Sequence, residues 1–412
     1  MGTRRQFLKD LAGGAALLGS GVLLPSLARG ADASAVGPAG LPAGTLESSF
    51  LEALPGKRPL IKRAYRPPNF ETPLEYFEQV FTPNDAFFVR YHLARIPEVA
   101  AAQWKLEIGG DGAEKPFTVD LASLQHDFEA VELPAVLQCS GNRRGLSDPH
   151  VAGVEWGIGA MGNAKWKGVR LKDLLAKAGL KKEAVEISFN GADQGPLDTT
   201  PDFVKSLPVW KATDENTLVA WQMNGAPLPH WNGAPARLVV PGWTGTYWMK
   251  HLVSVQALTQ PLKNFWMASA YRIPKGKFPI VDRFITQEAE ASTPITEMVV
   301  NSLITAPREG QVVHSGQPVE VKGIAWDNGA GIQTVEVSSD DGRNWQPATL
   351  DQDMGRLSFR GFRHTFKPGA KGEVTILARA TNRQGATQVS QLIFNPAGYH
   401  NNVVSRVNVR VG

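Results

Sequence analysis

The pattern of hydrophobic and polar residues changes along the chain, and the change predicts two domains. From Thr72 onward, short runs such as WKLEIGG, FTVDLASL and AVEISFNGAD have the apolar content of strands. FFVRYHL and PARLVVPGW are two further expected strands, and an acidic, aromatic helix is expected directly after Thr72. In VRLKDLLAKAGL apolar residues recur at helical spacing, with Gly179 placed as a helix stop. The mixture predicts an α+β domain over residues 73–290.

Beyond residue 290 the pattern becomes one of strands alone. Successive runs, among them QPVEVKGIAWD and GEVTILARATNRQGA, alternate apolar and polar positions. Turn signals such as Asp341-Gly342 separate these runs. Regular short strands of this kind are typical of an immunoglobulin-like β-sandwich, which we predict for residues 291–412. The expected linker between the two domains is EAEASTP, from Glu288 to Pro294.

The first 72 residues differ from both domains. TRRQFLKD precedes a weakly hydrophobic run rich in Gly and Ala, and ARGADA offers small residues for cleavage. This is the layout of an export signal, and the paired Arg4 and Arg5 resemble a twin-arginine signal. An ordinary secretory signal or a retained anchor is the alternative. We expect a signal over residues 1–30, export of the folded protein to the periplasm, and an N-terminal arm with little regular structure over residues 31–72.

Composition and charge limit the function classes. With 42% apolar and 20% charged residues, the chain has the composition of a globular protein. No later apolar run reaches the roughly 18 residues of a membrane span. The formal net charge is +4, but the expected signal carries four basic residues against one acidic residue. The mature chain is therefore near neutral, which gives no argument for nucleic-acid binding.

Cys139, in the stretch LQCSGNRRG, is the only cysteine of the chain. A single cysteine excludes an intrachain disulfide, a Cys₄ zinc site and a covalently attached c-type haem. A free cysteine is usually a small buried apolar residue, but the nearby Arg143 and Arg144 would stabilise a thiolate. A thiolate can act as a nucleophile or bind a soft metal. Histidines that could serve a nucleophile as a base are present, but no cysteine-protease signature surrounds Cys139.

The stretch LQCSGNRRG resembles the cysteine loop of the sulfite oxidase family, whose cysteine binds the molybdenum of a pterin cofactor. Other stretches that resemble this family follow in its order, including FFVRYHLA, the long run VAWQMNGAPLPHWNGAPARLVVPGWTGTYWMKHL and FWMASAYRIPKG. GIAWDNGAGIQTVEVSSDDGRNWQ resembles the family's C-terminal dimerisation sandwich. The resemblance covers nearly everything after residue 60. It implies a molybdenum–molybdopterin (Mo-MPT) cofactor, with Cys139 as the protein's ligand to the metal.

The resemblance also implies roles for single residues. Arg90 and Arg144 match the family's anion-binding arginines, and Tyr271 matches its active-site tyrosine, so these three are the expected catalytic residues. Arginine suits a compact dianion such as sulfite because its guanidinium offers several fixed donors. Arg143 could equally be a structural partner inside the loop. The expected cofactor-binding residues, besides Cys139, are His92, Asp193, Asn232, Arg237 and Lys250. Among them Asn232 departs from several animal members, which have histidine there.

Together the resemblance implies a periplasmic sulfite dehydrogenase that passes electrons to a c-type cytochrome on a separate chain. No stretch resembles a b-type haem domain, so no haem is expected on this chain. The sandwich could form a homodimer. One alternative is a related molybdenum enzyme acting on another substrate, for example a sulfane dehydrogenase or a sulfoxide or nitrate reductase. The other is a non-catalytic exported protein that binds oxyanions.

Overall fold

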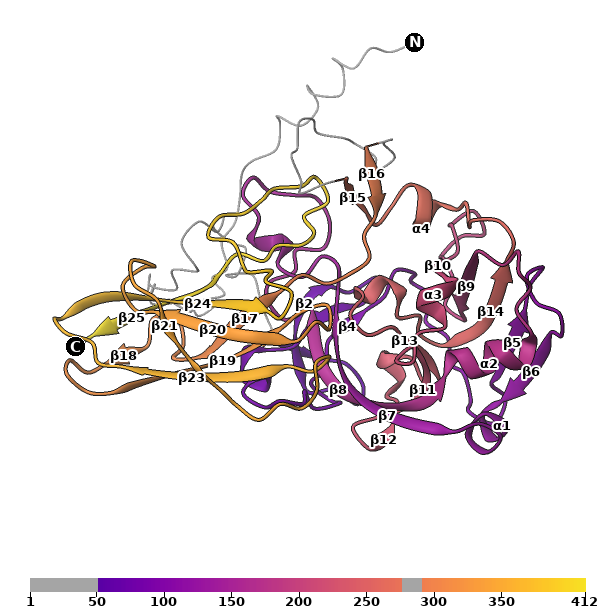
Figure 1. The fold of residues 1–412 in the computed structure, drawn as a ribbon, viewed down its shortest axis with the longest axis horizontal. Coiled ribbons are helices and arrows are strands. Elements are labelled where there is room, and N and C mark those ends of the chain that lie inside the picture. Colours follow the sequence, from indigo (N-terminus) through magenta and orange to yellow (C-terminus); the bar gives the residue numbers. More distant parts are fainter. Residues whose placement is uncertain (1–50, 276–290) are drawn as a thin grey trace, which may run out of the picture. The chain divides into compact units, whose positions relative to one another are not determined.

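The computed structural model describes residues 51–275 and 291–412 (Figure 1). The expected signal and the first part of the expected arm lie outside these ranges, as do the first three residues of the expected linker. Within the described ranges, no helix is long and apolar enough to cross a membrane.

The described end of the expected N-terminal arm forms strands, so the prediction of little regular structure is wrong there. Three of these strands and one later strand make an antiparallel sheet in chain order. Leu60 and Phe70 from the arm are fully buried with Val89 and Tyr91, and this small core explains the pairing. The strands are β1 (Leu51–Ala53), β2 (Pro59–Ala64), β3 (Asn69–Glu71) and β4 (Val89–Arg90).

A second sheet has the strand order β10-β9-β14-β5-β6, in which β14 runs parallel to β5 and antiparallel to β9. The stretch FTVDLASL, expected as one strand, divides at Asp120, whose side chain accepts a hydrogen bond from the Ser123 amide. Asp120 is thus the N-cap of a helix. The elements are β5 (Lys105–Gly109), β6 (Phe117–Asp120), α1 (Leu121–His126), β9 (Glu186–Gly191), β10 (Val204–Pro208) and β14 (Leu252–Leu258).

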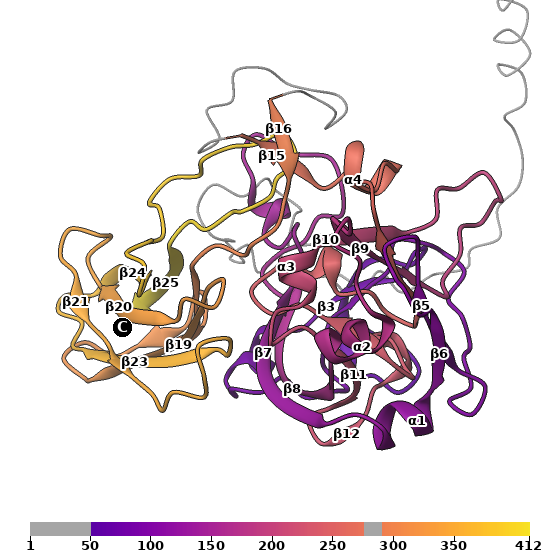
Figure 2. The ribbon, with the colours of Figure 1, turned by 45° about the vertical axis from the view of Figure 1, so that its right-hand side comes forward.

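The third sheet is built on a long antiparallel pair, β7 and β8, which Figure 2 shows as a curved ribbon. Its order is β12-β11-β8-β7, with β13 also paired to β11. The pair brings the chain to Cys139, the residue that follows β7. The bounds are β7 (Ala130–Gln138), β8 (Met161–Arg170), β11 (Leu218–Met223), β12 (Ala226–Pro227) and β13 (Arg237–Val239).

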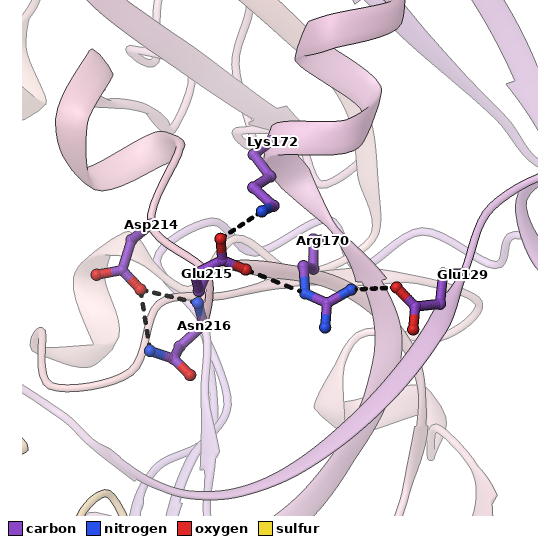
Figure 3. A network of polar contacts seen from close by, with 6 residues as sticks. All are labelled: Glu129, Arg170, Lys172, Asp214, Glu215 and Asn216. Atoms are coloured by element: carbon purple, nitrogen blue, oxygen red, sulfur yellow. Dashed lines mark hydrogen bonds and ion pairs between the residues drawn. The ribbon is translucent and has the colours of Figure 1, made fainter.

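The expected helix at the end of β8 is confirmed as α2 (Leu171–Ala178), with Gly179 in a left-handed conformation directly after it. A polar network lies at its start (Figure 3). Arg170 bonds Glu129 at 2.5 Å and Glu215 at 3.4 Å, and Lys172 also pairs with Glu215. The carboxylates are mostly exposed, so the network adds little to stability.

The remaining connections are short helical turns and one hairpin. The helix expected after Thr72 is only a 3₁₀ turn, η1. The described end of the expected linker, Ser292–Pro294, is β16, which pairs with β15. The turns and the partner strand are η1 (Leu74–Phe77), η2 (Arg144–Leu146), α3 (Val209–Ala212), η3 (His230–Asn232), η4 (Gly245–Tyr247), α4 (Phe265–Ala268) and β15 (Arg272–Pro274).

The predicted C-terminal β-sandwich is confirmed. One sheet has the order β17-β19-β23-β22 and the other β18-β25-β24-β20-β21, with β19 and β23 drawn below β20 and β24 in Figure 1. Alternate residues of both sheets, such as Val321, Val335 and Ile376, bury a common core. The strands are β17 (Asn301–Ala306), β18 (Val312–Val313), β19 (Val319–Trp326), β20 (Ile332–Ser338), β21 (Gln346–Pro347), β22 (Thr349–Leu350), β23 (Arg360–Phe366), β24 (Gly372–Asn382) and β25 (Ser405–Val411).

Candidate active site

A partly enclosed pocket opens beside Cys139. Its walls come from the segments after β4, β7 and β9, from β13, and from the stretch between η4 and β14. Seven of the predicted site residues line it: Arg90, His92, Cys139, Asp193, Arg237, Lys250 and Tyr271.

Hydrogen bonds to Ala160, the residue before β8, help to hold the cysteine loop. The Cys139 amide donates to the Ala160 carbonyl at 2.9 Å, and the Asn142 side chain accepts from the Ala160 amide at 3.0 Å. A Cβ atom at Gly141 would lie 2.7 Å from the Arg144 guanidinium, so a side chain there would displace that guanidinium. Cys139 is 7% exposed and faces the pocket through this turn.

Two other predicted site residues, Arg90 and His92, converge on the hydroxyl of Tyr271. Arg90 Nη2 lies 3.2 Å from Tyr271 Oη, and His92 Nε2 is also in hydrogen-bond contact with it. Burial and the cations Arg90 and Lys250 hold the pKa of His92 well below its usual range. A neutral His92 can therefore accept a hydrogen bond from the Tyr271 hydroxyl. Tyr271 has a φ of 56°, a strained conformation for a large residue, which is typical of a functional site.

Arg90 has a donor left over. Its Nη1 donates to Asn69 Oδ1 at 3.2 Å and to the Tyr91 carbonyl, but its buried Nε has no hydrogen-bond partner. Burial opposes the charge, yet the nearby Tyr271 and Cys139 outweigh it and raise the pKa of Arg90. The buried Thr246 hydroxyl, also on the pocket wall, has no partner either. Unpartnered buried donors of this kind indicate a ligand.

The other cations of the pocket are held by carbonyl oxygens. Arg237 donates to the carbonyls of Asn232 at 2.8 Å and Trp248 at 2.9 Å, and burial lowers its pKa to about 9. Lys250 Nζ donates to the Arg90 carbonyl at 2.6 Å. Burial also lowers the pKa of Lys250, although Asp193 opposes this.

The balance of charge in the pocket favours an anionic ligand. Among the described lining residues, Asp193 is the only carboxylate, against Arg90, Arg237 and Lys250. Burial raises the pKa of Asp193, so even this negative charge is weakened. Buried cations without acidic partners are unfavourable unless a ligand neutralises them. A phosphate-bearing pterin dithiolene with a soft metal supplies several negative charges, and Cys139 offers that metal a thiolate. The residues present therefore fit the Mo-MPT cofactor.

Comparison with known proteins agrees with this chemistry. Residues 92–266 match the family model "Oxidoreductase molybdopterin binding domain", and residues 292–412 match "Mo-co oxidoreductase dimerisation domain". Mitochondrial sulfite oxidase of Homo sapiens is 35% identical over 373 residues, which are 87% of this chain and 67% of that protein. The chain belongs to the sulfite oxidase family. It is a molybdopterin-binding oxidoreductase.

Two further proteins are similar to this chain at lower sequence identity. Sulfite oxidase of Arabidopsis thaliana is 31% identical over 319 residues, 73% of this chain and 79% of the plant protein. The crystal structure of the sulfane dehydrogenase SoxCD from Paracoccus pantotrophus has a TM-score of 0.70 with 24% identity, covering 93% of each chain. This second likeness shows a shared fold.

Two predicted site residues do not line the pocket of this sulfite oxidase family member. Arg144 Nε donates to the Ala397 carbonyl at 3.0 Å, and its guanidinium lies 5.1 Å from the ring centre of Tyr399. Tyr399 in turn stacks on Tyr271 with ring centres 5.9 Å apart. The ring of Tyr399 therefore separates Arg144 from Tyr271 on the pocket wall. Asn232 lies behind Arg237, and the backbone carbonyl of Asn232 accepts a hydrogen bond from the Arg237 guanidinium.

The partners of Arg143 lie outside the cysteine loop, contrary to the idea of a partner inside it. Its Nη1 donates to Asn301 Oδ1 at 2.8 Å and to the Val403 carbonyl at 2.7 Å. The Asn401 side chain donates back to the Arg143 carbonyl at 3.2 Å. Burial lowers the pKa of Arg143 to about 10. The sandwich domain and the segment before β25 thus hold the loop that carries Cys139.

Three further buried residues lie around the pocket, and the sequence does not predict them. Lys57 donates to Asn232 Oδ1 at 2.6 Å, and burial lowers its pKa to about 7. Lys205, on β10, has the same lowered pKa for the same reason. Tyr399 comes from the C-terminal segment. The lysines in PGKRP and FVKSLP both look exposed, and no local signal in the sequence could have identified them as buried.

Proposed function

We propose that this protein is an exported sulfite dehydrogenase, which oxidises sulfite to sulfate and passes electrons to a c-type cytochrome. The observation that carries the proposal is the unpartnered Nε of Arg90 beside the hydroxyl of Tyr271, in the cation-rich pocket that Cys139 faces. Sulfite and sulfate are compact dianions that need several fixed donors. The overall reaction converts sulfite and water into sulfate, two protons and two electrons.

Cys139 would hold the molybdenum, and Arg237, Lys250, His92 and Asp193 would hold the pterin and its phosphate. When bound, the cofactor supplies the two-electron redox chemistry. The carbonyl bonds of Arg237 and the fixed cysteine loop mean that these groups are oriented before the cofactor arrives. Such preorganisation reduces the reorganisation needed on binding.

For the substrate, Arg90 would donate its free Nε to a sulfite oxygen, and Tyr271 would present its hydroxyl to the same anion. His92 keeps that hydroxyl oriented, because its neutral ring accepts a hydrogen bond from the hydroxyl when the anion is absent. Arg144, behind Tyr399, adds positive charge to the approach without contact to the pocket. Donors held in place in this way are worth most where charge develops during reaction.

The deciding experiment is a comparison of electron donors with purified protein. We expect molybdenum and pterin in the protein, and sulfite-dependent reduction of cytochrome c. A carrier protein loaded with sulfane sulfur is the matched alternative substrate, chosen because the fold is shared with a sulfane dehydrogenase. Faster reduction of cytochrome c with the sulfane carrier would show that the carrier, and not sulfite, is the substrate. Sulfate binding without any bound molybdenum would favour the non-catalytic alternative.

Export and assembly are part of the same proposal. We propose twin-arginine export to the periplasm, no haem on this chain, and a homodimer formed through the C-terminal domain. Changing Arg4 and Arg5 to lysine should leave cofactor-loaded precursor in the cytoplasm, and normal periplasmic yield would contradict this route. Light scattering of the purified protein should give twice the chain mass. A mass equal to one chain plus one cytochrome would contradict the homodimer.

A further inference from the structure

Lys205 is a buried cation that the proposed reaction does not use. It lies on β10 and is 1% exposed. Its Nζ donates to the Trp266 carbonyl at 2.6 Å. Among the described residues no carboxylate is within ion-pair distance of this ammonium group. A buried lysine without an acidic partner is unfavourable, so its presence calls for another role.

The ammonium group lies against two buried aromatic rings. Its Nζ is 5.0 Å from the ring centre of Tyr247 and 5.4 Å from that of Tyr271. Both distances are within the range of a cation–π interaction, which is strongest where water is excluded. The hydroxyl of Tyr247 is used on the Ile295 carbonyl at 2.6 Å, whereas the hydroxyl of Tyr271 faces the pocket. Only the second ring therefore carries the effect of Lys205 into the site.

We propose that Lys205 is a positioning residue for Tyr271: its charge holds the tyrosine ring in place and makes the hydroxyl a stronger hydrogen-bond donor to the bound oxyanion. A positive charge against the ring stabilises the more negative phenol oxygen, and so polarises the O–H bond. The same ammonium also fixes the Trp266 carbonyl in α4, a few residues before the strained backbone of Tyr271. This inference rests on the proposed oxyanion site.

The surroundings make the charge of Lys205 depend on pH. Burial, and then Arg272, lower its pKa to about 7, while Glu186 opposes the shift. Glu186 itself is bonded to the Ser206 hydroxyl at 2.7 Å, so it stays beside the strand. Lys205 also contributes to the lowered pKa of His92. The charged and titratable groups that face Lys205 are thus His92, Glu186, Tyr247, Tyr271 and Arg272.

Three substitutions separate the charge of Lys205 from its hydrogen bond. Lys205→Arg keeps a charge at all working pH values, Lys205→Gln keeps a neutral donor, and Lys205→Met keeps neither. We expect kcat for sulfite to fall roughly 5- to 30-fold in the Gln and Met variants, the range that a desolvated cation–π contact supplies. The parent should lose kcat as pH rises through about 7, and Lys205→Arg should not. Parent-like kcat in Lys205→Gln or Lys205→Met would overturn the proposal.

A second measurement does not depend on turnover. Sulfate should raise the unfolding temperature of the parent more at low pH than at high pH, because the charge of Lys205 is then present. In Lys205→Arg this stabilisation should persist at high pH, and in Lys205→Met it should be weak throughout. Lys57 titrates alike in all proteins, so differences between variants report Lys205. An identical pH dependence in parent, Arg and Met variants would overturn the role of Lys205. Failure of the parent to oxidise sulfite, with this pattern intact, would overturn only the proposed substrate.

Discussion

Buried polar groups serve different ends in the sandwich and in the pocket. In the sandwich, Asp327 accepts hydrogen bonds from the amides of Gly329 and Gly331 and from the side chain of Asn382. Every one of these donors belongs to the same domain, and the carboxylate closes the turn between β19 and β20. Such a fully bonded group stabilises the fold without needing any other molecule.

In the pocket, buried cations instead bond to carbonyl oxygens and keep donors in reserve. Arg237 and Lys250 have carbonyl partners, and the Nε of Arg90 has none. Carbonyl dipoles fix the direction of a side chain but do not neutralise its charge. The difference teaches that burial alone does not mark a binding site. A binding site is marked by burial combined with an excess of one charge, which is positive in this pocket.

The largest effect on the pocket should come from Cys139→Ser. Serine is nearly the same size but is a protonated, hard donor, and it cannot replace a thiolate as a ligand for a soft metal. We expect sulfite-dependent cytochrome reduction per bound molybdenum to fall to background while the protein still folds. Retention of most of that activity would mean that Cys139 is not the ligand.

The next effect should come from Arg90→Ala, which removes the unpartnered donor. Loss of a charge-assisted contact to a dianion should raise KM for sulfite roughly 10- to 150-fold, with molybdenum content near normal. Steady-state kinetics and metal analysis check this together. Arg144→Ala is the comparison, since Arg144 lies behind Tyr399. A smaller rise in KM than for Arg90→Ala would support that placement, and a larger one would contradict it.

The cation excess should also appear in the pH dependence of stability. Burial lowers the pKa of Lys57 from its ordinary value of 10.5 to about 7 in the folded protein. Between about pH 7 and pH 10.5 the unfolded chain therefore binds more protons than the folded protein. The free energy of unfolding of cofactor-free protein should then rise with pH in this window, by up to about 1.4 kcal/mol per pH unit for this group. Lys57→Met should remove that contribution, as measured by denaturant unfolding at several pH values. An equal slope in variant and parent would contradict the buried charge.

On the sandwich side, Asp327→Ala should affect stability and leave the chemistry alone. It leaves buried amide donors unsatisfied, which costs about 1–3 kcal/mol for each such group. Thermal unfolding should show the loss, with kcat/KM for sulfite unchanged. A change in KM without a change in unfolding temperature would mean that Asp327 serves binding and not stability, contrary to the contrast between the two regions.

The smallest effect should come from the exposed network at the start of α2. Arg170→Ala breaks contacts to Glu129 and Glu215, whose carboxylates are largely in solvent. We expect a loss of about 0–1 kcal/mol in the free energy of unfolding, and less in high salt. A loss as large as that of Asp327→Ala would show that charge pairs stabilise this surface after all.

The sequence predicted the fold class and seven of the residues that line the pocket, and its failures have physical causes. The resemblance in the cysteine loop located Cys139, and seven predicted residues do line one pocket. The strands of residues 51–71 were missed because they are short and lack a clear apolar alternation, and they are stabilised by pairing with one another and with β4. Lys57 and Lys205 were missed because a lysine between Gly, Pro and Ser residues looks exposed. Burial of this kind depends on tertiary contacts that no local pattern carries.

The hold of the sandwich domain on the cysteine loop sets an order of events during synthesis. Asn401 lies 258 residues after Arg143, and Ala397 lies 253 residues after Arg144. When the ribosome has made Cys139, the partners that fix its loop do not yet exist. The metal's binding loop can reach its final form only after nearly the whole chain has been translated. We therefore expect cofactor loading to follow translation, and a chain truncated before Ala397 to lack these contacts to the cysteine loop.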